Sequence, residues 1–198
     1  MDSWLTLTSE DAHLFMGSYV NRVTGVPVTS KNRQPIRAVM AQMTRGGTVL
    51  DVGCAKGAEI RELFDSRAYL GLDISPPLVE LARVENPGFR FVRADATCLP
   101  FADRAFDFAI CKSVLEHVPS EEIAVGIFRE LARVGRRAIV VWHTPPIYDA
   151  TELIVLHGYI PSPLYQNHYA RTAFEFDDLR VDRRRIDEAF DLWVVERL

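Results

Sequence analysis

The chain is poor in lysine, poor in cysteine and without a long apolar run. Only Lys31, Lys56 and Lys112 are lysines, against twenty arginines, and acidic residues outnumber basic ones by 27 to 23, so the formal net charge is −4. A chain with this charge has no overall field that would attract nucleic acid or an anionic membrane surface. We therefore expect no nucleic acid and no membrane among its partners.

The few cysteines and the lack of long apolar runs argue against two further classes of protein, secreted and membrane-spanning. Three cysteines (Cys54, Cys98 and Cys111) cannot all pair, which favours reduced thiols in a cytoplasmic protein. No apolar run reaches the ~18 residues of a membrane-spanning helix, and no basic region followed by an apolar stretch stands at the N-terminus, so we expect neither membrane insertion nor secretion. With 198 residues, 48% of them hydrophobic, the chain is expected to form a single domain with one substantial core.

A glycine loop follows the first strongly apolar segment. Residues 49–57 read Val-Leu-Asp-Val-Gly-Cys-Ala-Lys-Gly, and a helix is predicted directly after them. Twenty residues after Gly53, Asp73 ends a second predicted strand. A strand, a glycine loop, a helix and then an acid form the arrangement that binds an adenosine-containing cofactor, because the acid binds the ribose hydroxyls and glycine admits close backbone contact.

The spacing of this loop narrows the choice of cofactor. The glycines follow Gly-x-x-x-Gly, whereas a pyrophosphate-binding loop reads Gly-x-Gly-x-x-Gly. Asp51, at the end of the strand, would also repel a diphosphate. Both features disfavour a nicotinamide-dependent oxidoreductase and suit a ligand with a cationic amino-acid tail and no phosphate. S-adenosylmethionine is such a ligand, and it is the cofactor that we predict.

The glycine loop is the first of five motifs along the chain. They are Val49–Gly57, Leu70–Ser75, Arg93–Ala96, Phe106–Ile110 and Ser113–Val118. Together they closely resemble the class I S-adenosylmethionine-dependent methyltransferases, in particular the subgroup that acts on small molecules. The resemblance covers about residues 33 to 145.

The resemblance implies a set of cofactor-binding residues. Gly53 and Gly57 would pass backbone close to the methionine moiety, Asp51 would face its amino group, Asp73 would bind both ribose hydroxyls, and Asp95 would accept from the adenine amino group. The full set is Asp51, Gly53, Cys54, Ala55, Gly57, Asp73, Ile74, Asp95, Ala96, Lys112 and Ser113.

The segments of the chain alternate between strand and helix periodicity. Predicted strands are Thr48–Val52, Ala68–Asp73, Arg90–Ala94, Phe106–Cys111 and Arg137–His143. Predicted helices between them are Ala58–Asp65, Pro76–Val84 and Ser120–Val134. This alternation predicts an α/β fold with a doubly wound, mostly parallel, Rossmann-like sheet, in which ligands bind beyond the carboxyl ends of the strands.

The single domain divides into three parts. Residues 1–45 would form an N-terminal cap and first helix, 46–143 the cofactor-binding core, and 144–198 a substrate-side lid with a last helix and strand. The predicted helix is Glu175–Ala189, with Arg183–Arg185 on its solvated face, and the strand is Phe190–Arg197. One such strand predicts a shortened antiparallel edge.

Two histidines are candidates for a general base. His143 ends a predicted strand and would face the mouth of the site, and His117 follows the strand before it. A hydroxyl acceptor needs its proton removed, which histidine can do near neutral pH. Aromatic and imidazole side chains of the lid are the candidates for binding the acceptor: Tyr148, Tyr165, His168 and Tyr169.

The function predicted from these residues is methyl transfer to a small polar acceptor, directed to oxygen more than to nitrogen. The alternative is a regulatory module that binds the cofactor without turnover. No histidine spacing matches a tight ligand pattern, so no metal is expected. A homodimer is compatible with the sequence.

Overall fold

The computed structural model describes most of the core of the chain and parts of both ends. The residues described are 20–21, 26–27, 34–58, 60–115, 118, 120–143, 176–186 and 190–198. The five strands and three helices predicted between residues 48 and 143 are all present, with ends shifted by a few residues.

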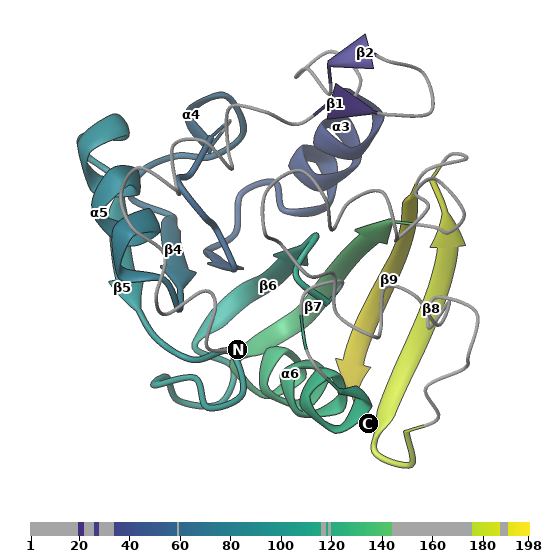
Figure 1. Cartoon of the computed structure of the whole chain (residues 1–198). Helices are drawn as coiled ribbons and strands as arrows, with labels where there is room; N and C mark the ends of the chain where they lie inside the picture. Colours follow the sequence, from purple (N-terminus) through teal and green to yellow (C-terminus); the bar gives the residue numbers. More distant parts are fainter. Residues whose placement is uncertain are drawn as a thin grey trace.

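A seven-stranded sheet forms the centre of the molecule (Figure 1). Its order is β5 (Arg90–Arg93), β4 (Tyr69–Asp73), β3 (Val49–Val52), β6 (Phe106–Lys112), β7 (Gly135–His143), β9 (Phe190–Arg197) and β8 (Leu179–Arg185). The first five strands are parallel, and β9 and β8 add antiparallel pairings at one edge. Strand order reverses between β3 and β6, which is where a doubly wound sheet opens a ligand site. The predicted Rossmann-like fold class is confirmed.

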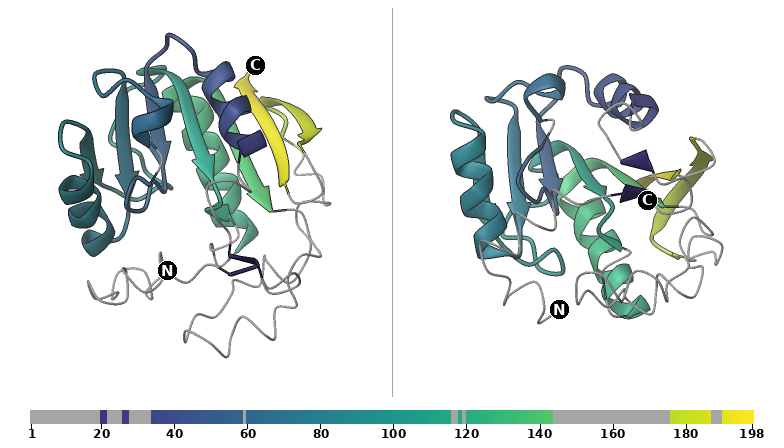
Figure 2. Two further views of the ribbon diagram at one scale, coloured as in Figure 1. Left: turned by 90° about the horizontal axis from the view of Figure 1, so that it is seen from above. Right: turned by 45° about the horizontal axis from the view of Figure 1, so that its top comes forward.

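Helices cover both faces of the sheet (Figure 2). One face packs against α6 (Glu121–Val134), and the other against α3 (Gln34–Met43), α4 (Ile60–Leu63) and α5 (Pro76–Glu85). The start of α6 is capped, because the Ser120 hydroxyl accepts a hydrogen bond from the backbone N–H of Ile123. A short antiparallel pair, β1 (Val20–Asn21) and β2 (Val26–Pro27), lies outside the sheet.

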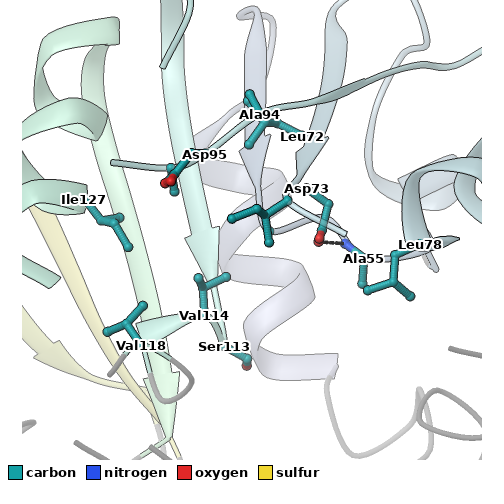
Figure 3. Close-up of a pocket in the computed structure, with 13 residues that line it drawn as sticks. Ala55, Leu72, Asp73, Leu78, Ala94, Asp95, Ser113, Val114, Val118 and Ile127 are labelled. Atoms are coloured by element: carbon teal, nitrogen blue, oxygen red, sulfur yellow. Dashed lines mark hydrogen bonds between the residues drawn. The ribbon is translucent and has the colours of Figure 1, made fainter. Parts of the chain in front are cut away.

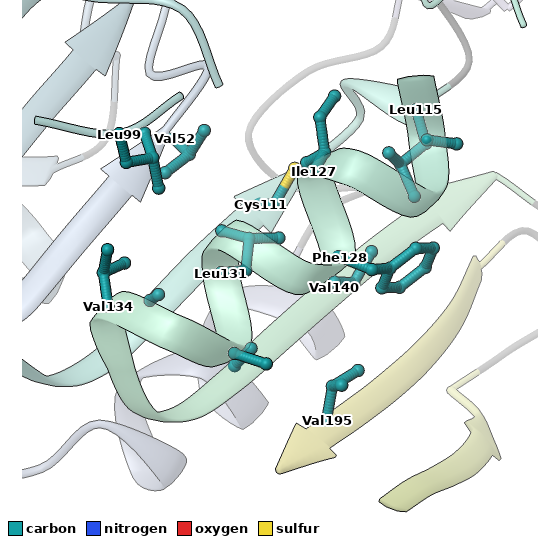
Figure 4. Packing of buried hydrophobic residues seen from close by; sticks show 14 of the residues in the cluster. Val52, Leu99, Cys111, Leu115, Ile127, Phe128, Leu131, Val134, Val140 and Val195 are labelled. Atoms are coloured by element: carbon teal, nitrogen blue, oxygen red, sulfur yellow. The ribbon is translucent and has the colours of Figure 1, made fainter. Parts of the chain in front are cut away.

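The larger core cluster lies between α6 and the sheet (Figure 4). Ile127, Phe128 and Leu131 of α6 are buried against strand residues that include Val140 and Val195. These helix positions recur at the three- and four-residue spacing of an amphipathic face. Burial of this apolar face fixes α6 against β6, β7 and β9, and so places Ile127 in one wall of the site.

The C-terminal region differs from the prediction. The predicted helix Glu175–Ala189 is wrong, because residues 179–185 form β8, which pairs along its whole length with β9. The predicted shortened edge is therefore wrong as well. The charged run suggested a solvated helix, yet alternate residues of the strand, Leu179 and Val181, face the core while the arginines stay exposed. Charged side chains are common on an edge strand, where they discourage further pairing.

None of the helices in the described segments combines the length and the apolar composition needed to cross a bilayer.

Candidate functional site

A pocket opens where the parallel strands end, on both sides of the point of reversal (Figure 3). Its walls come from the loop after β3, the ends of β4, β5 and β6, and the facing sides of α5 and α6. The residues lining it are Gly53, Ala55, Leu72, Asp73, Ile74, Leu78, Ala94, Asp95, Ala96, Ser113, Val114, Val118 and Ile127. The wall is mostly apolar with two carboxylates, which is the usual composition of a small-ligand site.

The loop after β3 is held in an unusual backbone conformation. Gly53 has a φ of +76°, and a Cβ at this position would lie 2.1 Å from Cγ2 of Val114. Ala55 also has a positive φ, 49°, although it carries a side chain. Left-handed backbone costs a non-glycine residue about 1–2 kcal/mol. Strain of this kind persists where the surrounding structure enforces it, and it is concentrated at functional sites.

Asp73 enforces that loop conformation. One carboxylate oxygen accepts from the backbone N–H of Ala55 and the other from that of Ser75, each at 2.9 Å. Asp73 is 7% exposed, and burial raises the pKa of its carboxylate, although hydrogen bonds from the backbone of Ser75, Ala55 and Ile74 oppose the shift. Each oxygen retains acceptor capacity toward the pocket. A pair of vicinal hydroxyls, such as those of a ribose, fits this requirement.

Asp95 presents a second carboxylate beyond the end of β5. Its Oδ1 accepts from both the backbone N–H and the hydroxyl of Thr97, at 2.8 Å each. Its Oδ2 accepts no hydrogen bond from the described residues. A half-buried carboxylate with one open oxygen suits an amino group of a bound ligand, which is the role predicted for Asp95 toward adenine.

Asp51 belongs to β3, just before the glycine loop, and its side chain is hydrogen-bonded to the neighbouring strand β4. Its carboxylate accepts a 2.7 Å hydrogen bond from the hydroxyl of Tyr69, which is fully buried. Burial raises the pKa of Asp51 to about 6, while the Tyr69 hydrogen bond and the charge of Lys112 limit the rise. The same burial and the Asp51 charge raise the pKa of the Tyr69 hydroxyl. The group that would face the methionine amino group thus titrates near neutral pH.

Tyr69 is a residue that the sequence did not single out. It starts β4 and reads as an ordinary core aromatic. The register of β3 and β4 sets Asp51 opposite Gly71, which makes Tyr69 its diagonal neighbour two residues away. Only the strand pairing supplies this contact.

The structure brings seven of the eleven predicted cofactor residues together at the pocket: Gly53, Ala55, Asp73, Ile74, Asp95, Ala96 and Ser113. The other four lie behind the lining. The thiol of Cys54 packs over Gly71, Gly57 turns the backbone beside Phe91 with a φ of +64°, and Asp51 and Lys112 sit deeper in the strands. Whether each contacts the cofactor stays a prediction.

Six lining residues were not predicted: Leu72, Leu78, Ala94, Val114, Val118 and Ile127. All are apolar, and the sequence offers no signal that separates them from core residues. Ile127 belongs to the helical apolar stripe of α6 and faces the pocket only because α6 begins close to it. Ser113 was predicted, and its positive φ of 55° adds a second strained position to the wall.

The candidate catalytic and acceptor-binding residues fall largely outside the described residues. His117, Tyr148, Tyr165, His168 and Tyr169 belong to this group. The backbone of His143 ends β7, opposite Phe190 of β9. Since the backbone N–H of Ser113 bonds to the carbonyl of Val141, β7 runs beside the strand that delivers Ser113. Their roles stay predictions.

Comparison with known proteins identifies the core. Residues 50–138 match the family described as "Methyltransferase domain". The chain is 34% identical over 118 residues to the probable tRNA methyltransferase 9B of Mus musculus, covering 57% of this chain and 26% of the relative. It is 31% identical over 134 residues to the tRNA (carboxymethyluridine(34)-5-O)-methyltransferase of Saccharomyces cerevisiae, covering 63% and 48%. The chain thus spans between a quarter and a half of these relatives.

A solved structure extends the likeness to the fold of the whole chain. The magnesium protoporphyrin IX methyltransferase of Synechocystis PCC 6803, solved with bound S-adenosylhomocysteine, has a TM-score of 0.59 and 22% identity, covering 100% of this chain and 97% of that one. The resemblance to class I methyltransferases is confirmed, and the family indicates S-adenosylmethionine as the cofactor.

The comparisons correct one expectation. A small-molecule acceptor with no nucleic acid among the partners is wrong, because several curated relatives are tRNA methyltransferases. The expectation rested on a net charge of −4 summed over the chain. A sum of charges does not describe how they are distributed over a surface, and local fields steer a polyanion.

Proposed function

Because residues 50–138 form a class I methyltransferase domain, we propose that this protein transfers the methyl group of S-adenosylmethionine to an oxygen atom of a nucleoside in tRNA. The observation that carries the cofactor part is the pocket at the strand ends, whose lining includes the carboxylates of Asp73 and Asp95 and the glycine loop at Gly53. The relatives that act on tRNA support the acceptor part.

The residues of the pocket divide the work of holding the cofactor. Asp73 is placed to accept from two hydroxyls while it fixes the loop through Ala55. Ile74 and Val114 offer apolar surface for a flat ring, and Asp95 an acceptor at its edge. The absence of a side chain at Gly53 leaves backbone within reach of the ligand's amino-acid tail.

The cofactor supplies an already activated methyl group, so the chain contributes chiefly alignment. Holding two reactants in line can be worth about 7–11 kcal/mol of barrier. An oxygen acceptor that carries a proton also needs a base, and His143, at the end of β7, is proposed for that role. The base would add about 10²–10⁴-fold in rate.

A labelling experiment tests both parts of the proposal. The purified protein is incubated with S-adenosylmethionine tritiated on the methyl group and with total tRNA. Controls use tRNA digested by nuclease and the small-molecule fraction of the same extract. We expect label in intact tRNA and its recovery in a single modified nucleoside, identified by mass after digestion.

The products also report the atom methylated. Label that alkali releases marks an ester oxygen, whereas label that survives alkali marks an ether, nitrogen or carbon. Label confined to small molecules would contradict the tRNA acceptor and leave the enzyme class intact. Binding of S-adenosylhomocysteine with no labelled product in any fraction would favour the regulatory alternative.

A further inference from the structure

Three exposed arginines near the β5 edge of the sheet have no acidic partner among the described residues. Arg67, Arg90 and Arg93 lie in the turn before β4 and at the two ends of β5. The guanidinium groups of Arg90 and Arg93 donate to backbone carbonyls, and no carboxylate of the described residues lies within ion-pair distance of any of the three guanidinium groups. Positive charge therefore gathers at this edge.

Backbone contacts fix where these arginines lie. An Nη2 of Arg90 donates to the carbonyl of Arg67 at 3.5 Å, which holds these two residues side by side. The Nε of Arg93 donates to the carbonyl of Ile74 at 3.3 Å. Arg93 is also in register with Asp73. Arg93 thus lies at the rim of the pocket, and Arg90 lies at the other end of β5, about 10 Å away along the strand and on the opposite face of the sheet.

Resting on the proposed tRNA function, we propose that Arg67, Arg90 and Arg93 bind phosphate groups of the RNA substrate. Guanidinium groups form paired, charge-assisted hydrogen bonds with phosphate oxygens, and each contact releases condensed counterions. The three arginines lie at the edge of the sheet nearest Ile74 and Asp95, away from Ser113. Their contacts are therefore with phosphates outside the methylated nucleoside, and they set the position of the RNA rather than read its sequence.

The backbone of β5 argues against a protein strand as the occupant of this edge. A strand that added to the sheet would need the outward-facing carbonyls of β5. Arg83 of α5 already donates from Nη2 to the carbonyl of Phe91 at 2.9 Å, which blocks the middle of a strand only four residues long. A covered, short edge resists strand addition. The side chains of Arg90 and Arg93 are exposed, although the Phe91 carbonyl between them is occupied.

Arginines at the opposite edge of the sheet provide a matched control. Arg180 and Arg184 of β8 are as exposed, but Arg180 is paired with Glu196 and Arg184 with Asp182. Figure 1 shows β5 and β8 at opposite ends of the sheet. Removing two arginines from either edge changes the net charge equally, so a difference between the variants reports location.

The experiment measures tRNA affinity against salt concentration by fluorescence anisotropy. The variants are Arg67→Gln/Arg90→Gln, which leaves the contact to Ile74 in place, a triple variant that adds Arg93→Gln, and the control Arg180→Gln/Arg184→Gln. We expect the double variant to bind about tenfold more weakly and to lower the slope of log affinity against log salt by about 1.4–1.8. The triple variant should lose more tRNA affinity than the double variant, and the control variant should lose little.

Cofactor binding and melting temperature are measured on every variant, and a fall in the salt slope is a result that misfolding alone does not produce. If the wild-type protein methylates tRNA while the edge variants keep its affinity and slope, the inference is wrong and the proposed function stands. Equal losses in the edge and control variants would also overturn it. If the wild type binds S-adenosylhomocysteine but no tRNA, the proposed acceptor fails and the inference fails with it.

Discussion

The two halves of the sheet treat charge in opposite ways. In the parallel half, Asp73 is buried and Asp51 is half-buried, each with hydrogen-bonding partners but no bonded cation among the described residues, and desolvation raises the pKa of each. In the antiparallel half, Glu196 lies at the surface between Arg137 and Arg180, and the Arg137 hydrogen bond lowers its pKa. In the parallel half the charged form of each carboxylate is therefore destabilised, whereas in the antiparallel half the charge of Glu196 is neutralised by two arginines.

The difference shows which half of the sheet has hydrogen-bond acceptors left for a ligand. A carboxylate without a bonded cation has acceptor capacity left for a ligand, whereas a carboxylate shared by two arginines has little. Two of the three described non-glycine residues with positive φ, Ala55 and Ser113, line the pocket, and the third, Arg104, lies in the turn before β6. The antiparallel half instead contributes apolar burial around Trp193. Variants of the two halves should therefore separate stability from cofactor affinity.

The largest expected effect is on stability, in the antiparallel half. Trp193 is 2% exposed and stacks on Phe128, with ring centroids 5.6 Å apart. Trp193→Ala should lower the free energy of unfolding by about 3–5 kcal/mol, as measured by denaturant titration. Affinity for S-adenosylhomocysteine, measured by calorimetry where the variant is folded, should stay within about twofold. A parallel loss of affinity would show that the halves are coupled through α6.

The pH dependence of stability should follow Asp51. Its folded pKa of about 6 lies above its ordinary value of 3.8, so the folded state holds a proton that the unfolded state releases between these values. The free energy of unfolding should therefore fall by about 3 kcal/mol as pH rises through this window, and the loss should persist above it.

Asp51→Asn removes this titration and keeps an acceptor for Tyr69. The variant should be more stable than the wild type at pH 8 and nearly equal to it at pH 4, as followed by urea unfolding at both values. A variant less stable than the wild type at pH 8 would show that the buried charge is compensated by groups outside the described residues.

Cofactor affinity should depend on Asp73. Asp73→Ala removes an acceptor for two hydroxyls, and hydrogen bonds to a charged group are worth about 1.5–3 kcal/mol each, so S-adenosylhomocysteine should bind about 10²-fold or more weakly. Asp182→Ala, at an exposed carboxylate of β8, should leave the affinity unchanged. Equal losses in calorimetry would refute the ribose assignment.

Two glycines with the same backbone angle separate strain from contact. Gly53 and Gly46 have φ values of +76° and +75°, but a Cβ at Gly46 would meet nothing within 4 Å. Gly46→Ala should cost only the left-handed strain, about 1–2 kcal/mol. Gly53→Ala should cost about 1–3 kcal/mol more through the clash with Val114 and should also weaken cofactor binding. Equal melting temperatures for the two variants would contradict the contact argument.

The smallest effect is expected at Glu196. Its lowered pKa means that its contribution to stability is present above its ordinary pKa of 4.5 and is lost as pH falls through the folded value. Glu196→Gln should therefore cost about 1 kcal/mol or less at pH 7, and progressively less as pH falls through the folded pKa of Glu196. At high pH Glu196→Gln should lower the free energy of unfolding, whereas Asp51→Asn should raise it. If both substitutions changed it in the same direction, the contrast between the two halves would be wrong.

Local patterns in the sequence were sufficient to specify the parallel core and most of the pocket. Alternating strand and helix periodicity is local, and glycine and acid at fixed distances from the strand ends carry a direct physical meaning. Gly53, Asp73 and Asp95 could therefore be placed at the pocket from the sequence, since each ends or follows a strand that the pattern defines, while their contacts with the cofactor stay predictions.

Features that depend on pairing between distant segments were settled by tertiary packing. The charged run of β8 has no helical or strand preference strong enough to choose, and its partner β9 imposed the strand. The Tyr69 contact to Asp51 follows from the β3–β4 register, and the apolar wall at Ile127 from the docking of α6. Local propensity is weak beside such packing. The net charge of the sequence likewise did not reveal how the arginines of the described residues divide, with carboxylate partners along β8 and backbone partners along β5.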